Sequence, residues 1–372
     1  MRRYTILHTI EGGGPGGAET VLLQLASQVD PGRFRSLALL SSEKWLRQQL
    51  VKRGIETALV DSRAWYDFRL PKAMAKLIRQ EKVDLIHSHL PDQNFYSCLV
   101  GRLTGTKTIV TYHGAPRLSR GNRFRRGVKS CVVRHSAAAV VVVSDYLRTL
   151  FEAAGFPAEK IVRIYNGVDV DRFSQPQEGG VRAELGLGAN TKLVGMVANL
   201  RQSKGYEYFI RAARQITDCI PEARCVAVGE LDKTIAGRMR ELIRQLNLEE
   251  RFFLLGFRSD IPQILGDLNV FVLSSTDEGL SIATIEAMAA GKPVVVTRSG
   301  GPEEIVQDGE TGFLVPSADP QALATRVCEI LRYPGLGAQL GARARSEVER
   351  RFTLSKMISE YEALYARCLE AN

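Results

Sequence analysis

The sequence contains no hydrophobic run long enough to cross a membrane. Its longest unbroken apolar stretch is Ala137–Val143, whereas a membrane-spanning helix needs about 20 apolar residues. Near the start, Arg2 and Arg3 precede an apolar stretch that His8 and Glu11 interrupt. We therefore expect neither a membrane-spanning helix nor a cleaved signal peptide.

Cysteine motifs are also missing. None of the cysteines belongs to a CxxC pair or has a zinc-finger spacing. We therefore expect buried thiols in a reducing cytoplasm, not disulfides or a zinc site. The histidines that we considered are not spaced as zinc ligands either, so we expect no bound metal. The residues concerned are Cys98, Cys131, Cys219, Cys225, Cys328 and Cys368, and His8, His87, His89 and His135.

Acidic residues are scarce in one part of the chain. Residues 101–150 hold ten Lys or Arg and a single acidic residue, within a chain of net charge +9. Residues 1–180 carry 27 bases against 16 acids, whereas the remainder carries 23 against 25. A basic region of this kind indicates an anionic partner, which could be phospholipid, nucleic acid or a phosphorylated substrate.

Apolar strands alternate with amphipathic helices along the whole length. The strands are continuously apolar, which is typical of a parallel sheet covered on both faces. The stretch Ser174–Gly180 is rich in residues that break helices and strands, and it interrupts the pattern. The alternation starts again after it. We predict an α/β fold of two doubly wound, Rossmann-like domains, residues 1–174 and 175–353, and a C-terminal helix, 354–372, that packs back on the first domain. The predicted strands are Tyr4–Ile10, Ser36–Leu40, Thr57–Val60, Val83–His87, Thr108–Tyr112, Ala138–Val143 and Ile161–Ile164, then Leu193–Ala198, Arg224–Val228, Phe252–Leu255, Val270–Leu273, Pro293–Thr297 and Gly312–Val315.

A glycine-rich loop follows the first strand. Gly12, Gly14 and Gly17 satisfy the G-x-G-x-x-G pattern of dinucleotide-binding proteins. The acidic residue that this pattern requires after the second strand has only a distant candidate in Glu43, which makes hydride transfer a minor alternative. The loop nevertheless allows the backbone to approach a ligand closely at a helix N-terminus.

Two cations follow the first strand of the second domain. Arg201 and Lys204 leave its carboxyl end, and Gly205 allows a helix to begin directly after them. Ligands of open α/β sheets bind at that end of the strands. An arginine and a lysine at this position can neutralise a diphosphate without a metal ion.

The stretch "DEGLSIATIEAMAAGKPVV", residues 277–295, combines a turn, a helix and two carboxylates. The amides of 279–281 precede a predicted helix, 282–290, where unpaired N–H groups favour an anion. Glu278 would be repelled by a bare phosphate but could bind sugar hydroxyls beside it. Glu286 lies about two turns further along and could accept hydrogen bonds from a ribose. Together with the two cations, these groups describe a sugar–diphosphate–ribose ligand.

This stretch resembles the signature of the retaining family 4 glycosyltransferases, which have the two-domain GT-B fold with both domains facing a cleft. The resemblance extends over nearly the whole chain. It rests on "GGAE" at 16–19, "IHSHLPD" at 86–92, "TYHG" at 111–114, "SDYLR" at 144–148, "YNGVDVDRF" at 165–173, "NLRQSKG" at 199–205, "LLGFRSD" at 254–260 and "SGGPEE" at 299–304.

The resemblance implies roles for individual residues of the donor site. Lys204 and Arg201 would bind the donor diphosphate, although many members place the arginine where this chain has Asn199. Glu278 would hold the donor sugar and Glu286 the ribose. The remaining donor-binding residues would be Gly279, Leu280 and Ser281 for sugar and phosphate, and Gly256, Phe257 and Arg258 for the base.

From the first domain, the resemblance implies that His113 contacts the donor sugar and that Gly17 allows the glycine loop to close over it. His113 and Glu278 would be the residues nearest the chemistry. The reaction would retain the anomeric configuration, and it would need no metal or other cofactor beyond the nucleotide-sugar donor.

We therefore expect a glycosyltransferase that moves a hexose or N-acetylhexosamine to a glycan or lipid-linked acceptor in envelope polysaccharide synthesis. Two alternatives remain open: a nucleotide-sugar epimerase and a non-catalytic nucleotide-sugar-binding protein. The basic, partly apolar stretch 117–135 could lie on an anionic membrane, which would place a cytoplasmic enzyme at the inner face of the membrane. Nucleic-acid binding is not expected, because aromatic interleaving and known modules are missing.

Overall fold

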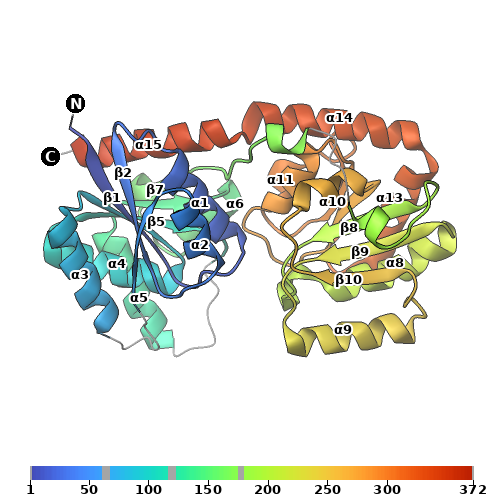
Figure 1. Cartoon of the computed structure of the whole chain (residues 1–372), viewed down its shortest axis with the longest axis horizontal. Coiled ribbons are helices and arrows are strands. Elements are labelled where there is room, and N and C mark those ends of the chain that lie inside the picture. Colours follow the sequence, from blue (N-terminus) through green and yellow to red (C-terminus); the bar gives the residue numbers. More distant parts are fainter. Residues whose placement is uncertain (1, 61–67, 116–122, 175–179, 371–372) are drawn as a thin grey trace. The chain divides into compact units, whose positions relative to one another are not determined.

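The structure, a computed structural model, describes residues 2–60, 68–115, 123–174 and 180–370, with the backbone alone at 123–126. It divides into two compact units (Figure 1). The N-terminal unit comprises Met1–Asn166 and Met357–Asn372, and the C-terminal unit is Gly167–Lys356. Residues 175–179, within the stretch expected to separate the domains, lie outside the described residues.

A parallel sheet in the order β3-β2-β1-β4-β5-β6-β7 forms the N-terminal unit. Its strands coincide with the predicted ones, with ends displaced by no more than two residues. The strands are β1 (Tyr4–Ile10), β2 (Phe34–Leu40), β3 (Glu56–Leu59), β4 (Leu85–His89), β5 (Lys107–Tyr112), β6 (Ala139–Val142) and β7 (Ile161–Arg163). The helices are α1 (Gly17–Gln28), α2 (Trp45–Lys52), α3 (Arg69–Glu81), α4 (Pro91–Thr104), α5 (Arg123–Ser136), α6 (Asp145–Ala153) and α15 (Leu354–Glu370), with a short η1 (Ala158–Lys160).

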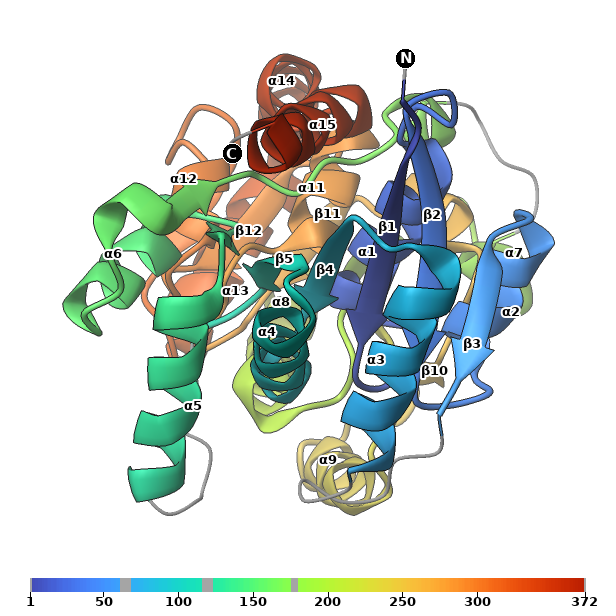
Figure 2. The same cartoon turned by 90° about the vertical axis from the view of Figure 1, so that its left-hand side faces the viewer.

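Helices cover both faces of this sheet. Leu7 and Ile86 pack with α3 and α4, which lie side by side in Figure 2. Ile10, two residues after His8 and therefore on the opposite face from Leu7, packs with α1 and α2. Tyr365 of α15 reaches that second face, where it contacts His87. The C-terminal helix thus covers part of the first sheet.

The C-terminal unit has a second parallel sheet, in the order β10-β9-β8-β11-β12-β13. Its core joins the strands to α8, α9 and α13. The strands are β8 (Lys192–Val197), β9 (Ala223–Val228), β10 (Phe252–Gly256), β11 (Val270–Leu273), β12 (Val294–Thr297) and β13 (Phe313–Val315). The helices are α7 (Val181–Glu184), α8 (Tyr206–Cys219), α9 (Lys233–Gln245), α10 (Ile261–Asp267), α11 (Ile282–Ala289), α12 (Pro302–Ile305), α13 (Pro320–Arg332) and α14 (Pro334–Arg351), with short turns η2 (Asp171–Phe173) and η3 (Gln202–Lys204). The prediction of two doubly wound α/β domains is confirmed.

In each sheet the strand order reverses at one place, between β1 and β4 in the first sheet and between β8 and β11 in the second. The loops that leave neighbouring strands at such a point diverge and leave room for a ligand. In the second sheet, these are the loops that carry Lys204 and Glu278. The topology therefore brings together two motifs that the sequence separates.

The cysteines differ from expectation in one respect. All six are free thiols, but Cys131 is exposed on α5 and Cys219 is only half-buried at the end of α8. The expectation that all six are buried was therefore wrong, because both helices turn these positions outward. No helix within the described ranges is long and apolar enough to span a bilayer.

Candidate functional site

The loops after β8 and β11 are in direct contact. Thr276 donates its amide to the carbonyl of Ser203 at 2.8 Å, and the Ser274 hydroxyl donates to the carbonyl of Gly205 at 2.9 Å. Gly205 has φ +62°, and a Cβ there would lie 2.0 Å from the Ser274 carbonyl oxygen. Only glycine satisfies both conditions, so Gly205 is what allows the two loops to meet.

Lys204 and Glu278 form an ion pair across these loops. The Lys204 ammonium lies 2.5 Å from Glu278 Oε1, which also accepts a hydrogen bond of 2.8 Å from the Ser275 hydroxyl. The side chain of Glu278 is 8% exposed and that of Lys204 is 24% exposed. The pair therefore holds both charges at the carboxyl end of the sheet, with the Lys204 side chain still partly exposed.

Free backbone amides lie next to this pair. Within the described part of the chain, the amides of Gly279, Leu280 and Ser281 have no hydrogen-bond partner, although all three residues are buried. The Ser281 hydroxyl caps α11 by accepting from the amide of Thr284. Because buried amides are nearly always paired, an unpaired group of this kind at a helix N-terminus is suited to an anion.

A second glycine contact fixes this turn from the other side. Gly301 donates its amide to the carbonyl of Glu278 at 2.9 Å, and a Cβ on Gly301 would lie 2.1 Å from the carbonyl oxygen of Gly279. Glu303 in turn accepts from the amides of Ser299 and Gly300. The sequence analysis quoted "SGGPEE" without giving it a role; the structure shows that it supports the turn after Glu278.

Glu286 lies in the second turn of α11 and is partly buried. Burial raises the pKa of its carboxyl to about 7, and the charge of Arg172 opposes that shift. No other described side chain forms a hydrogen bond with its carboxylate. It is therefore free to bind hydroxyl groups of a ligand.

The other residues predicted to bind donor differ in how they are held. Arg201 is exposed and has no ion-pair partner in the described ranges, while the Asn199 side chain accepts from the amide of Glu230 at 3.0 Å. The guanidinium of Arg258 is bound by Asp260 at 2.6 Å and by Glu184.

Next to Arg258 in the chain, Phe257 is 47% exposed and follows Gly256, which has φ +72°. This leaves the aromatic ring and the backbone of the loop for a ligand.

In the N-terminal unit, His113 lies just after β5 and pairs with His89 at the end of β4. His89 Nδ1 and His113 Nε2 are 3.0 Å apart, and the two rings are stacked. Burial lowers the pKa of His113 to about 4, so both imidazoles are neutral near pH 7. Gly17 is exposed at the first position of α1. The sequence analysis gave His89 no partner, because the pairing depends on β4 and β5 being neighbours.

Three histidines that seemed unrelated in sequence lie together. Nitrogens of His8, His87 and His89 are within 4.8 Å of one another, because His8 and His87 face each other across β1 and β4. Both nitrogens of His87 are already bonded, to the hydroxyls of Tyr365 at 2.6 Å and Thr111 at 2.8 Å. A metal bound there would have to displace one of these bonds, so the cluster is better suited to neutral packing.

An acidic pair at the same edge was also missed. Glu11 follows β1 and accepts a hydrogen bond from the backbone of Asp92, whose carboxylate lies 2.5 Å from the Lys129 ammonium. Burial, and then the charge of Asp92, raise the pKa of Glu11 to about 7. The sequence signal was weak, since Glu11 directly follows β1 and Asp92 lies in the first turn of α4.

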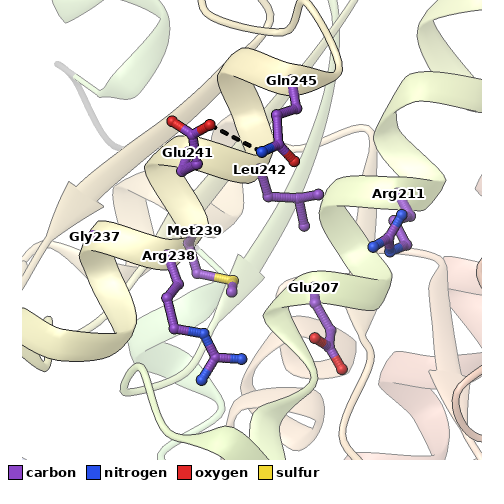
Figure 3. A pocket seen from close by; sticks show the side chains of 8 residues that line it. All are labelled: Glu207, Arg211, Gly237, Arg238, Met239, Glu241, Leu242 and Gln245. Carbon is purple, nitrogen blue, oxygen red and sulfur yellow. Dashed lines mark hydrogen bonds between the residues drawn. The ribbon is translucent and has the colours of Figure 1, made fainter.

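A separate hollow lies between α8 and α9 (Figure 3). It has a volume of about 440 Å³, and charged side chains such as Arg211 and Arg238 line it. None of its lining residues belongs to the loops after β8 or β11. It is an open groove between two helix surfaces and is distinct from the candidate site.

Comparisons with known proteins identify the family of this chain. Residues 15–172 match the family model described as Glycosyltransferase Family 4, and residues 180–347 match Glycosyl transferases group 1. Among curated proteins, the chain is 26% identical over 311 residues to N-acetyl-alpha-D-glucosaminyl L-malate synthase of Bacillus anthracis, covering 81% of this chain and 79% of that protein. It is 27% identical over 305 residues to UDP-Gal:alpha-D-GlcNAc-diphosphoundecaprenol alpha-1,3-galactosyltransferase of Escherichia coli, covering 79% and 78%.

Solved structures extend the likeness over the whole length. The chain is 26% identical to Anabaena Alr3699/HepE in its complex with UDP-glucose, with a TM-score of 0.89 and coverage of 97% of this chain and 99% of that one. Sucrose-phosphate synthase of Thermosynechococcus elongatus, at 21% identity and TM-score 0.86, shares the fold over 100% of both chains. The two family models between them account for both units, and the protein is therefore a glycosyltransferase of the group 1 and family 4 type.

Proposed function

We propose that this enzyme transfers a hexose or N-acetylhexosamine from a nucleotide-diphosphate sugar to a glycan or lipid-linked acceptor in cell-envelope polysaccharide synthesis. The observation that carries the proposal is the Lys204–Glu278 pair beside the free amides of 279–281. One loop supplies a cation and the other supplies peptide dipoles, which together suit a diphosphate with a sugar attached.

Each group has a distinct task in this proposal. The amides and Lys204 stabilise the charge that develops on the departing diphosphate, and exposed Arg201 supplies a second cation. Glu278 accepts hydrogen bonds from the sugar hydroxyls, and Glu286 accepts them from the ribose. His113 approaches the sugar from the N-terminal unit. These groups compensate the charge of the diphosphate, so the proposal includes neither a metal nor another cofactor.

We further propose that the anomeric configuration is retained. The proposal assigns Glu278 and Glu286 to ligand hydroxyls, so neither of them acts as a separate base. The departing phosphate oxygen then takes the proton of the acceptor hydroxyl as that hydroxyl attacks from the same face.

The acceptor is proposed to be membrane-proximal. Seven basic residues in 117–135 have no acidic neighbour within that stretch. Residues 117–122 of this stretch lie outside the described ones, while Val128 and Cys131 are exposed on α5. One relative has diphosphoundecaprenol, a lipid carrier, in its name. We therefore place the protein at the inner face of the cytoplasmic membrane.

Donor binding and donor hydrolysis test the central proposal. Purified protein is screened by thermal shift against nucleotide sugars, starting with UDP-glucose and UDP-galactose because UDP occurs in the names of two similar proteins. The binding sugar is then incubated with and without EDTA. We expect slow release of free nucleotide diphosphate at the same rate in both. Binding without release would support the binding-protein alternative, and conversion of the sugar without an acceptor would support an epimerase.

Vesicle flotation tests the membrane proposal separately. We expect the protein to float with vesicles that contain anionic phosphatidylglycerol and to remain behind with pure phosphatidylcholine, with binding lost at high salt. Equal partitioning to both vesicle types would contradict a basic membrane-binding surface.

A further inference from the structure

Two helices of the C-terminal unit bring cysteines together far from the donor loops. Cys219 is the last residue of α8, and Cys328 lies on α13, which packs against α8. Arg332 follows Cys328 by four residues and therefore projects from the same face of α13. Neither cysteine has a role in the proposed sugar transfer.

The three side chains are in contact. Arg332 donates from Nη2 to the sulfur of Cys219 at 2.7 Å. The Cys328 thiol also hydrogen-bonds to Cys219, and its pKa is raised, first by burial and then by that bond. Cys219 is thus the shared acceptor, with a cation on one side and a thiol on the other. The guanidinium and the second thiol therefore meet at the same sulfur atom.

Exposure separates the roles of the two thiols. Cys219 is half-buried and open to solvent, whereas Cys328 is 6% exposed. Cys225 on β9 is completely buried, and burial raises the pKa of its thiol above the ordinary range. Of these three cysteines of the C-terminal unit, Cys219 is the one that solvent reaches, and Cys328 is the thiol that contacts it.

We propose that Cys219 and Cys328 form a redox-reactive thiol pair, with Cys219 as the peroxide-sensitive nucleophile and Cys328 as the resolving thiol. The Cys219 thiolate attacks one oxygen of hydrogen peroxide, the O–O bond breaks, and the released hydroxide takes a proton to become water. Cys219 becomes a sulfenic acid. The Cys328 sulfur then attacks it, an S–S bond forms, and the sulfenic oxygen leaves as a second water with the Cys328 proton. Peroxide is reduced by two electrons and the two thiols are oxidised.

The pair lies at the opposite end of α8 from Lys204. A helix of this length separates its ends by roughly 20 Å. The modification site is therefore independent of the donor site, and the proposal goes beyond the proposed function. Its test uses mass spectrometry and does not depend on any transferase activity.

The experiment treats the folded, full-length protein with a stepwise excess of hydrogen peroxide, blocks the remaining thiols and digests it. We expect a disulfide between the peptides of Cys219 and Cys328, with faster migration on a non-reducing gel, reversed by dithiothreitol. In Cys328→Ser, dimedone should instead trap sulfenic acid at Cys219. Exposed Cys131, which lies beside His135, serves as an internal comparison for simple accessibility.

A matched pair of arginine variants tests the role of the cation. Arg332→Gln should slow the oxidation of Cys219 several-fold, whereas Arg326→Gln, on the same helix but paired with Glu329, should leave it unchanged. The proposal is overturned if oxidation reaches Cys131 while Cys219 stays reduced. It is equally overturned if Cys219 is oxidised without any link to Cys328, or if both arginine variants react like the wild type.

Discussion

At the scale of single residues, the Lys204–Glu278 pair has two tasks that can be separated. In the free protein each charge neutralises the other, since the carboxylate of Glu278 is nearly buried and Ser275 is its one further partner among the described residues. In the donor complex, Lys204 would also face the diphosphate. A substitution of one partner therefore changes both folding and binding.

We expect Lys204→Met to lower the free energy of unfolding of the C-terminal unit by about 1–3 kcal/mol, because it leaves the Glu278 carboxylate buried without its cation. The double variant Lys204→Met/Glu278→Gln should recover much of this loss. Donor hydrolysis should remain at least about 100-fold reduced in both, because the diphosphate still lacks its cation. Urea unfolding and a nucleotide-release assay measure the two effects. Recovery of hydrolysis in the double variant would show that Lys204 acts on Glu278 alone.

Glu286 gives the donor site a pH dependence of known sign. Its pKa of about 7 means that the carboxyl is partly protonated at neutral pH. The proposed hydrogen bonds from two ribose hydroxyls would favour the carboxylate. Donor affinity should therefore fall as the pH drops below 7, by up to about tenfold per pH unit. Titration calorimetry over roughly one pH unit on either side of that pKa measures this change in donor affinity.

The variant Glu286→Gln serves as the control for that titration, since it should bind donor more weakly but with an affinity that does not change with pH.

The raised pKa of Glu286 also predicts how this substitution affects folding stability. Because the folded state holds the proton up to pH 7 and the unfolded carboxyl loses it near 4.5, stability falls as the pH rises through this range. Glu286→Gln should therefore be at least as stable as the wild type above pH 7.

At the scale of elements, α15 is fixed to the first sheet by two buried tyrosines. Tyr365 bonds to His87 at 2.6 Å, and Tyr361 bonds to Thr111 at 3.3 Å. Tyr365 and His87 have no exposed surface. Removal of the Tyr365 hydroxyl thus leaves a buried imidazole nitrogen without a partner.

We expect Tyr365→Phe to destabilise the N-terminal unit by about 1–3 kcal/mol. Tyr361→Phe is the matched control and should lower the free energy of unfolding by less. The Tyr361–Thr111 hydrogen bond that it removes is long, and Thr111 keeps its bond to His87. Denaturant unfolding of both variants gives the comparison. An equal effect would mean that ring packing, and not the hydrogen bond to His87, secures the helix.

At the scale of the whole molecule, the two units should respond differently to acid. Burial lowers the pKa of His8 to about 3 and of His113 to about 4, and it lowers the pKa of His87 and His89 well below the usual 6.5. As the pH falls below 6.5, the unfolded chain binds protons that these folded imidazoles do not, so the stability of the N-terminal unit decreases. Glu11, with its raised pKa, opposes this but is a single group.

We therefore expect the free energy of unfolding of the N-terminal unit to fall by several kcal/mol between pH 6.5 and pH 5. Each histidine contributes up to about 1.4 kcal/mol per pH unit to this fall. Both tryptophans of the chain lie at positions 45 and 65, in the N-terminal unit. Tryptophan fluorescence thus follows this unit alone, whereas circular dichroism follows both.

The thermal unfolding transition seen by fluorescence should move to lower temperature in acid. This shift should be larger than the shift of the dichroism transition that comes from the C-terminal unit. His8→Leu removes two unbonded buried nitrogens and should reduce the shift. A fluorescence transition that does not change with pH would contradict neutral burial of the histidines.

The sequence predicts elements better than contacts. Each predicted strand is present because a continuous apolar run buried on both faces has few other stable arrangements. Lys204 and Glu278 could each be named because they follow strands, and the carboxyl ends of parallel strands face the same side. The Lys204–Glu278 bond, the support of the turn by Gly301 and the pairing of His89 with His113 could not, because each depends on strand order.

The sequence by itself determined that this chain is a double α/β protein, since hydrophobic periodicity is a property of short segments. It also predicted the turn after Glu278, because local turn chemistry is a property of short segments too. Tertiary structure decided which of those segments meet. The ordering β9-β8-β11 joins residues 204 and 278, β1-β4-β5 gathers four histidines, and the packing of α8 on α13 joins Cys219 to Cys328. Such contacts between distant segments follow from the packing of the sheets and helices as a whole. Patterns within short segments of the sequence do not predict them.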